Sequence, residues 1–177
     1  MREMTEDVFY DYIKKYDKLL LDYVILSADD EYCGEISHKK AVATAILALN
    51  SRRRVGNMFN PPDFYVDETK MSCEKCDTEN FFTVSPKRMV YDYWTYSDVF
   101  LNSDCMPYSV PYTEENFHKV NRVLFPACYR KNLEIYRWND SFSNYFDYGN
   151  DCLGTAMWSV YDRHMMRFII IGSSIID

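Results

Sequence analysis

Cys73 and Cys76 are the only two cysteines in this sequence that are separated by two residues. Two thiolates at this spacing can bind one Zn²⁺ ion with tetrahedral geometry, but a structural zinc site needs four ligands. The sequence has no second pair of this kind, so the other two ligands must come from distant positions. His118 lies in a predicted helix and Cys128 follows its end, and if the cysteine pair binds zinc, we predict that these two residues complete the site with Cys73 and Cys76.

Two other interpretations of the cysteine pair stay open. The first is a pair of reduced thiols in or near a turn, without a metal. The second is a redox pair of the thioredoxin type, which normally lies between a strand and a helix of a βαβ unit. The segment after the pair, Thr78–Val84, has no helical pattern, and this disfavours the redox interpretation.

A second set of residues fits the carboxylate and lysine signature of metal-dependent nucleases. Asp63 follows a proline, and Glu68 and Lys70 come next in the order that the signature requires. In such enzymes two acidic side chains hold Mg²⁺ and the lysine orients or activates a water molecule. Only four residues separate Asp63 from Glu68, which leaves little room for a strand, a turn and a second strand. A metal-dependent nuclease or hydrolase is therefore the alternative function, behind a non-enzymatic one.

Aromatic residues are frequent in this chain, which contains 16 Tyr and 11 Phe. Tyr is amphipathic and is common where proteins contact one another. Two segments combine aromatic and turn-forming residues, Ser97–Pro111 and Asn139–Asp151. The residues in or beside them that we expect to contact a partner protein are Tyr108, Tyr112, Phe142, Tyr145, Phe146 and Tyr148. The alternative is that the first segment is a plain surface loop and the second covers an edge of the core.

The charge balance and the apolar runs bear on partners and location. The chain has 20 basic and 27 acidic residues and a formal net charge of −7, which disfavours general attraction to nucleic acid. The first residues lack the apolar core of a signal peptide, and no stretch approaches the roughly 20 apolar residues of a membrane span. Six cysteines without a secretion signal are typical of a reducing compartment. We therefore expect a cytoplasmic or nuclear protein without a membrane partner.

Motifs of common enzyme sites are missing from the sequence. Neither of the glycine-rich phosphate-binding patterns occurs, and the HExxH and GxSxG motifs are also absent. Only three histidines are present, which leaves few general bases. The expected function is an intracellular regulatory module that binds another protein, with zinc as a stabilising ion if the cysteine pair is a metal site. The Tyr-, Asn- and Phe-rich composition also favours a viral factor that binds host proteins.

Hydrophobic periodicity predicts three helices. The first begins after Thr5, a good N-cap, and continues to Val24, the second covers His38–Asn50, and the third runs from Glu114 to about Phe125. Extended, β-prone runs predict the strands Phe81–Val84, Met89–Trp94 and Asn132–Trp138, followed by a hairpin of Met157–Tyr161 and Met165–Ile171. His38 would lie in the first turn of its helix and is given no role.

These elements predict an α+β fold in a single domain that spans residues 1–177. About three helices would pack on a mostly antiparallel sheet of roughly four to six strands. The helical N-terminal part would cover about residues 5–54, and the mixed, β-rich part would cover about residues 63–177.

Overall fold

One antiparallel sheet runs through the middle of the protein. The computed structural model describes residues 1–56, 62–84, 94–101, 112–147 and 155–174. The strands lie in the order β1-β5-β4-β3-β2, and each neighbouring pair is antiparallel. Their bounds are Asp22–Ser27 for β1, Cys73–Cys76 for β2, Leu133–Trp138 for β3, Thr155–Asp162 for β4 and Arg167–Ser174 for β5.

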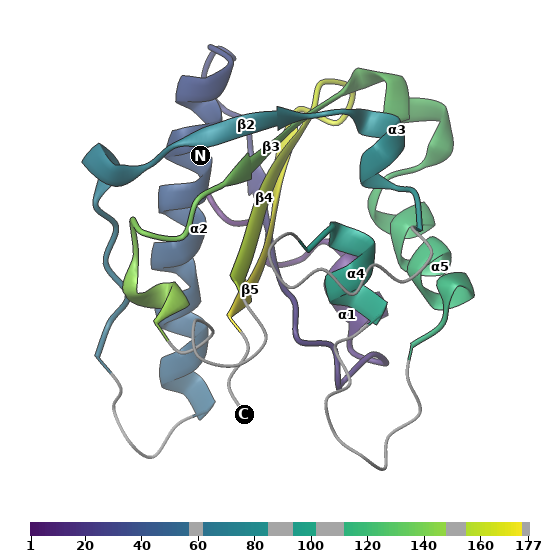
Figure 1. The fold of residues 1–177 in the computed structure, drawn as a ribbon, viewed down its shortest axis with the longest axis horizontal. Coiled ribbons are helices and arrows are strands. Elements are labelled where there is room, and N and C mark those ends of the chain that lie inside the picture. The colour runs from purple at the N-terminus through teal and green to yellow at the C-terminus, as the bar shows by residue number, and fades with distance from the viewer. Residues whose placement is uncertain (57–61, 85–93, 102–111, 148–154, 175–177) are drawn as a thin grey trace.

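Helices cover both faces of this sheet. The α-helices are α1 (Val8–Ile13), α2 (Glu35–Gly56), α3 (Thr78–Phe81), α4 (Tyr96–Leu101) and α5 (Glu114–Leu124). Short 3-10 helices are η1 (Glu68–Lys70), η2 (Ala127–Asn132) and η3 (Asn144–Phe146). Figure 1 shows α2 on one side of the sheet and α1, α3, α4 and α5 on the other. In the described part of the chain, no helix has the length and apolar character that crossing a bilayer requires.

The central strands are buried on both faces because each face supports its own apolar layer. Alternate residues of a strand point to opposite faces. Trp158 and Val160 of β4 therefore pack in the layer of α1, α3, α4 and α5, whereas Met157 and Tyr161 pack in the layer of α2. A strand that is buried on both faces has a nearly continuous apolar sequence, as β5 does at Ile169–Ile171.

The α+β class and the antiparallel sheet are confirmed. The third predicted helix is α5, which begins with a reciprocal capping box between Thr113 and Asn116. The second predicted helix is present and longer than expected, as α2. The strand at Asn132–Trp138 and the C-terminal hairpin are also present, as β3 and as β4 with β5.

The prediction of one long N-terminal helix is wrong. The carboxylate of Asp7 accepts a hydrogen bond from the N–H of Phe9 and caps the short helix α1, which ends at Ile13. The chain then enters β1, where Val24 lies opposite Ile170 of β5. Apolar residues that fit a helical period also fit a buried strand when they are consecutive, and pairing with β5 decides between the two structures.

Two predictions around the cysteine pair are also corrected. The segment Phe81–Val84 is not a strand, because Asp77 caps the short helix α3 through a bond from the N–H of Asn80. The segment Ser97–Pro111 was predicted to be a loop, but its first residues, to Leu101, belong to the helix α4. The predicted strand Met89–Trp94 lies outside the described residues except for Trp94, which is in no strand.

Candidate functional site

The two cysteines of the predicted zinc site lie on opposite faces of the sheet. Both belong to β2, where Cys73 lies opposite Trp138 and Cys76 lies opposite Ile135. Their separation by three positions in an extended strand directs the side chains to different faces. Cys73 packs against the α2 layer and Cys76 against the layer of α3, α4 and α5. In this strand the two thiols do not converge on one ion.

The surroundings of both cysteines favour the protonated thiol. Burial and the nearby carboxylate of Glu35 raise the pKa of Cys73 to about 12. Burial and Glu74 raise the pKa of Cys76 to about 11. Metal binding and thiol chemistry both use the thiolate, and neither site stabilises the thiolate at neutral pH.

The other two predicted zinc ligands lie on different elements. The Nε2 atom of His118 is 3.3 Å from the carboxylate of Glu114, one helical turn away on α5. Cys128 is exposed in η2. Within the ranges that the structure describes, no three His, Cys, Asp or Glu side chains are grouped so that they could hold one metal ion. The structure therefore does not assemble Cys73, Cys76, His118 and Cys128 into one site.

The residues of the alternative nuclease site do not form a recognisable catalytic group either. The backbone carbonyl of Asp63 accepts a hydrogen bond from the side chain of Asn144. Glu68 and Lys70 are exposed at the two ends of η1, and Lys70 pairs with Asp67 at 3.3 Å. Asp63 and Glu68 belong to no group of three potential ligands among the described residues.

Three of the four described aromatic residues that were predicted to contact a partner are buried in the core. Phe142, Tyr145 and Phe146 are 0%, 3% and 0% exposed and pack in the α2 layer. Their burial corrects the expectation of a recognition surface and agrees with the alternative in which this segment covers an edge of the core. Tyr112 is half-buried, and its hydroxyl accepts a hydrogen bond from the N–H of Lys18. Tyr108 and Tyr148 lie outside the described residues.

The sheet ends in an edge strand, β2, whose outer side is free of backbone partners in the described part of the chain. The N–H of Asn139 donates to the carbonyl oxygen of Ser72 (3.0 Å), directly before β2. Backbone groups of an antiparallel strand alternate between its two sides. Glu74 and Cys76 therefore direct their N–H and C=O groups toward β3, and Cys73 and Lys75 direct theirs outward. No described strand pairs with this outer side.

The opposite edge of the sheet is covered by the chain itself. Residues next to the N-terminus run beside β1, and Glu3 forms an antiparallel bridge with Leu26. The N–H of Met4 donates to the carbonyl of Ile25 at 2.8 Å, and the N–H of Ser27 donates to the carbonyl of Arg2 at 2.9 Å. The two edges thus differ: a segment of the same chain satisfies the outer side of β1, and no described segment does so for β2.

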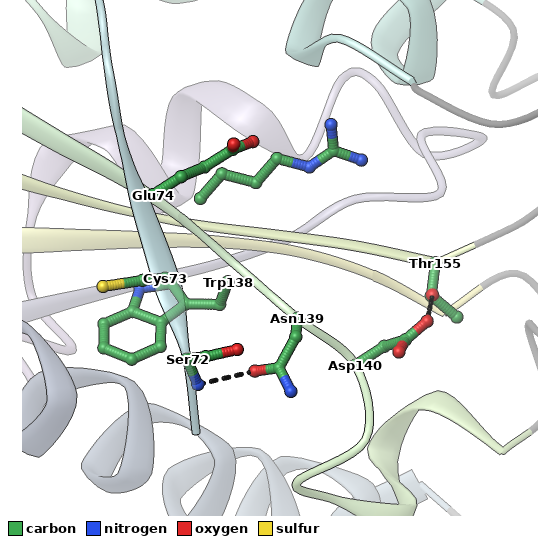
Figure 2. Close-up of a pocket in the computed structure, with 8 residues that line it drawn as sticks. Ser72, Cys73, Glu74, Trp138, Asn139, Asp140 and Thr155 are labelled. Carbon is green, nitrogen blue, oxygen red and sulfur yellow. Dashed lines mark hydrogen bonds between the residues drawn. The ribbon is translucent and has the colours of Figure 1, made fainter. Parts of the chain in front are cut away.

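Two pockets follow β2 along its length. The first edge pocket has a volume of about 370 Å³ and lies at the start of β2 (Figure 2); it is lined by Ser72, Cys73, Glu74, Arg137, Trp138, Asn139, Asp140 and Thr155. The second edge pocket has a volume of about 470 Å³ and lies at the end of β2; it is lined by Glu74, Lys75, Cys76, Asp77, Asn80, Phe81, Thr83, Trp94, Thr95, Tyr96, Arg137 and Trp158. The pockets share Glu74 and Arg137, so together they accompany the whole edge strand.

Hydrogen bonds fix the walls of the first edge pocket. Figure 2 shows the side-chain oxygen of Asn139 accepting from the N–H of Ser72 at 2.9 Å, and the Thr155 hydroxyl donating to Asp140 at 2.6 Å. The amide of Asn139 also donates to the carbonyl of Lys70 at 2.9 Å. Asn139 therefore holds the residues before β2 against the end of β3 and sets the start of the edge strand.

A buried polar chain behind β2 is the feature that sequence reasoning missed. His38 is fully buried; its Nδ1 lies 2.8 Å from the Ser159 hydroxyl, and its Nε2 lies 3.1 Å from the Tyr32 hydroxyl. Tyr32 also bonds to Glu134, which forms ion pairs with Lys75 of β2 and with Arg163. A lone histidine in a predicted helix carries no sequence signal for this arrangement, because its partners lie on distant strands.

One assignment of donors and acceptors gives every polar group in this chain a hydrogen-bond partner. The indole N–H of Trp138 donates to Ser159 at 2.8 Å, which leaves the Ser159 proton for His38 Nδ1. The neutral imidazole then carries its proton on Nε2 and donates it to Tyr32, whose own proton goes to Glu134. Burial lowers the pKa of His38 to about 4, in agreement with a neutral imidazole.

Comparison with known proteins adds no relative: no family model, no curated protein and no solved structure matches this chain. The fold and the candidate site define an α+β domain with one open sheet. The N-terminal segment of the same chain covers the β1 edge of the sheet, and two pockets lie beside its other edge strand, β2.

Proposed function

We propose that this chain is a non-enzymatic protein-binding module that receives an extended segment of another protein as an additional strand beside β2. The observation that carries the proposal is the outward direction of the backbone groups of Cys73 and Lys75. Strand addition satisfies such groups with main-chain hydrogen bonds and places alternate side chains of the partner in neighbouring pockets. Both edge pockets are lined in part by residues of β2 and so lie beside the proposed strand.

The charge on the edge strand is compatible with strand addition. Lysine on an edge strand commonly hinders pairing with other chains. However, the ammonium group of Lys75 lies 3.3 Å from the carboxylate of Glu134, which is on β3. This ion pair draws the lysine side chain over the sheet and away from the outer side of β2.

The proposed location is the cytoplasm or the nucleus. The four described cysteines, Cys33, Cys73, Cys76 and Cys128, are all free thiols. Free thiols persist in reducing compartments, where disulfides are rare. Zinc is not part of the proposal, because the two thiols of β2 face different layers.

A proline at position 75 tests the proposal, since it removes the outward N–H and leaves the bonds between β2 and β3 in place. The probe is a random peptide library displayed on phage, enriched on the folded protein, and the affinity of an enriched peptide is then measured by isothermal calorimetry. We expect Lys75→Pro to weaken binding about tenfold. Lys75→Ala is the matched control, because it removes the same side chain and keeps the N–H, and we expect it to bind like the wild type. Equal affinities of Lys75→Pro and Lys75→Ala, with unchanged thermal unfolding, would contradict strand addition.

A further inference from the structure

The floor of the second edge pocket is a fixed group of aromatic rings. The rings of Phe81 and Tyr96 are stacked with centroids 4.9 Å apart and planes 19° apart. The ring of Trp158 meets Phe81 nearly edge to face, at 6.2 Å and 71°. These three side chains are 6%, 1% and 2% exposed, so they belong to the core and expose only what the pocket reaches. Such a floor keeps its shape when the pocket is empty.

The position of this floor relates it to β2. Trp158 lies on the central strand β4 and shares its face of the sheet with Cys76 of β2. Side chains that share one face of an extended strand recur about every 6.6 Å. An added strand beside β2 would therefore direct every second side chain toward this face, and one of them would lie above the second edge pocket.

The groups around the pocket favour an uncharged occupant. Its lining contains the charged residues Glu74, Asp77 and Arg137, and also Lys75, whose ammonium group is paired with Glu134. The carboxylate of Asp77 already accepts the N–H of Asn80. A charged side chain would lose hydration over the aromatic floor. An aromatic side chain would find stacked or edge-to-face partners, and a volume of about 470 Å³ accommodates it.

We infer that the second edge pocket binds an aromatic side chain of the segment that adds to β2. This inference rests on the proposed function and names the residue class that the partner must carry. The pocket thereby selects among extended segments, all of which offer the same backbone groups to β2.

Filling the pocket from its rim tests the inference. Asn80 is exposed and lines the pocket, and the bonds that we find for it in the helix cap are made by its backbone. In Asn80→Trp the new ring would occupy the pocket, so we expect a peptide from the displayed library to bind at least about tenfold more weakly. The matched control is Glu79→Trp, which adds the same ring at the neighbouring exposed position outside the pocket, and it should bind like the wild type. The enriched peptides should carry Phe, Tyr or Trp at one fixed position.

A small probe gives a second reading that needs no peptide. The chain has three tryptophans, and two of them, Trp94 and Trp158, line the pocket. N-acetyl-phenylalaninamide should shift the indole N–H signals of Trp94 and Trp158 in a ¹⁵N correlation spectrum and leave Trp138 unchanged, and Asn80→Trp should abolish the shifts. N-acetyl-aspartamide should shift none of them.

The results separate this inference from the proposed function. If Asn80→Trp binds peptides as tightly as Glu79→Trp, or if enriched peptides show no aromatic preference, the aromatic pocket is refuted. Strand addition then still stands on the difference between Lys75→Pro and Lys75→Ala. If those two variants bind alike, strand addition is refuted, and with it the role of the pocket in that mode of binding.

Discussion

The imidazole of His38 and the hydroxyl of Ser159 lie 2.8 Å apart between α2 and the sheet, where both residues are fully shielded from solvent. This contact joins the first turns of α2 to the central strand β4. Because an unpaired polar group is costly in such a place, loss of either side chain would leave the other with an unsatisfied buried group. Because His38 is buried in the folded protein, its pKa differs between the folded and the unfolded chain.

The stability of the protein should therefore fall in mild acid. Burial lowers the pKa of His38 from 6.5 to about 4, with Glu134 opposing and Lys75 adding to the shift. Between these two values the unfolded chain binds the proton and the folded chain does not, so the free energy of unfolding rises with pH. The contribution of His38 is fully present above pH 6.5, is lost between about pH 6.5 and 4, and amounts to roughly 3 kcal/mol. Urea unfolding at a series of pH values measures it.

A histidine outside the buried hydrogen-bonded chain supplies the control for this pH dependence. His118→Gln should keep the acid slope, because His118 is partly exposed on α5 and lies outside the buried chain of His38, Ser159 and Tyr32. His38→Gln should flatten the slope between pH 6.5 and 4 and lower the stability at pH 7. An equal slope in wild type and His38→Gln would show that other groups cause the acid sensitivity.

Removing the Ser159 hydroxyl should cost more than removing another buried serine hydroxyl. Ser159 receives the indole N–H of Trp138 and contacts His38, so Ser159→Ala leaves two buried groups without partners. We expect a loss of roughly 2–4 kcal/mol in the free energy of unfolding. Ser173 is also buried, but its hydroxyl donates to one carbonyl, that of Leu20, so Ser173→Ala should cost about 1 kcal/mol. Similar losses in the two variants would contradict a shared hydrogen-bonded chain.

The elements that sequence reasoning predicted are those whose signals are local. Thr113 and Asn116 cap α5 within four residues of sequence, and the helix has a regular apolar stripe. The β4–β5 hairpin joins two consecutive β-branched or aromatic runs through a short turn. Local capping and short connections can be read from a sequence because both partners lie in one window.

Two of the missed elements, β1 and β2, depend on partners far away in the chain, whereas α3 was missed although its cap, Asp77 with the N–H of Asn80, is local. β1 is a strand because Val24 and its neighbours pair with β5, and β2 is a strand because Cys73 and its neighbours pair with β3. Two cysteines at this spacing suit a metal-binding turn in isolation, and only the pairing with β3 places them on opposite faces. The edge strand and its pockets could not be predicted for the same reason.

Glycine at position 172 is required by a neighbouring tyrosine. A Cβ atom added to Gly172 would lie 2.7 Å from the hydroxyl oxygen of Tyr145, which donates to Asp22 at 2.8 Å. Gly172→Ala should therefore destabilise the protein by about 1–3 kcal/mol, because the ring or the strand must shift. Tyr145→Phe removes the clashing oxygen, so Gly172→Ala should cost less in that background. Additive losses in a double-mutant cycle of thermal unfolding would show that the two positions do not interact.

The last prediction concerns the ion pair that fixes the N-terminal segment. Arg167 of β5 is buried; its guanidinium donates to the carboxylate of Asp7 at 2.9 Å and to the carbonyl of Leu124 at 2.8 Å. Asp7→Asn keeps an oxygen that can cap α1 but removes the negative charge. The variant therefore measures the contribution of the ion pair separately from that of the cap. Loss of one partner leaves a buried charge uncompensated, and we expect a cost of about 3 kcal/mol. Asp11→Asn, in the same helix but exposed, should cost no more than about 0.5 kcal/mol. If both variants unfold at the same urea concentration, Arg167 does not depend on Asp7, and the N-terminal segment that covers the β1 edge must be held by its backbone bonds and by other side-chain contacts, such as that of Glu3 with Arg52.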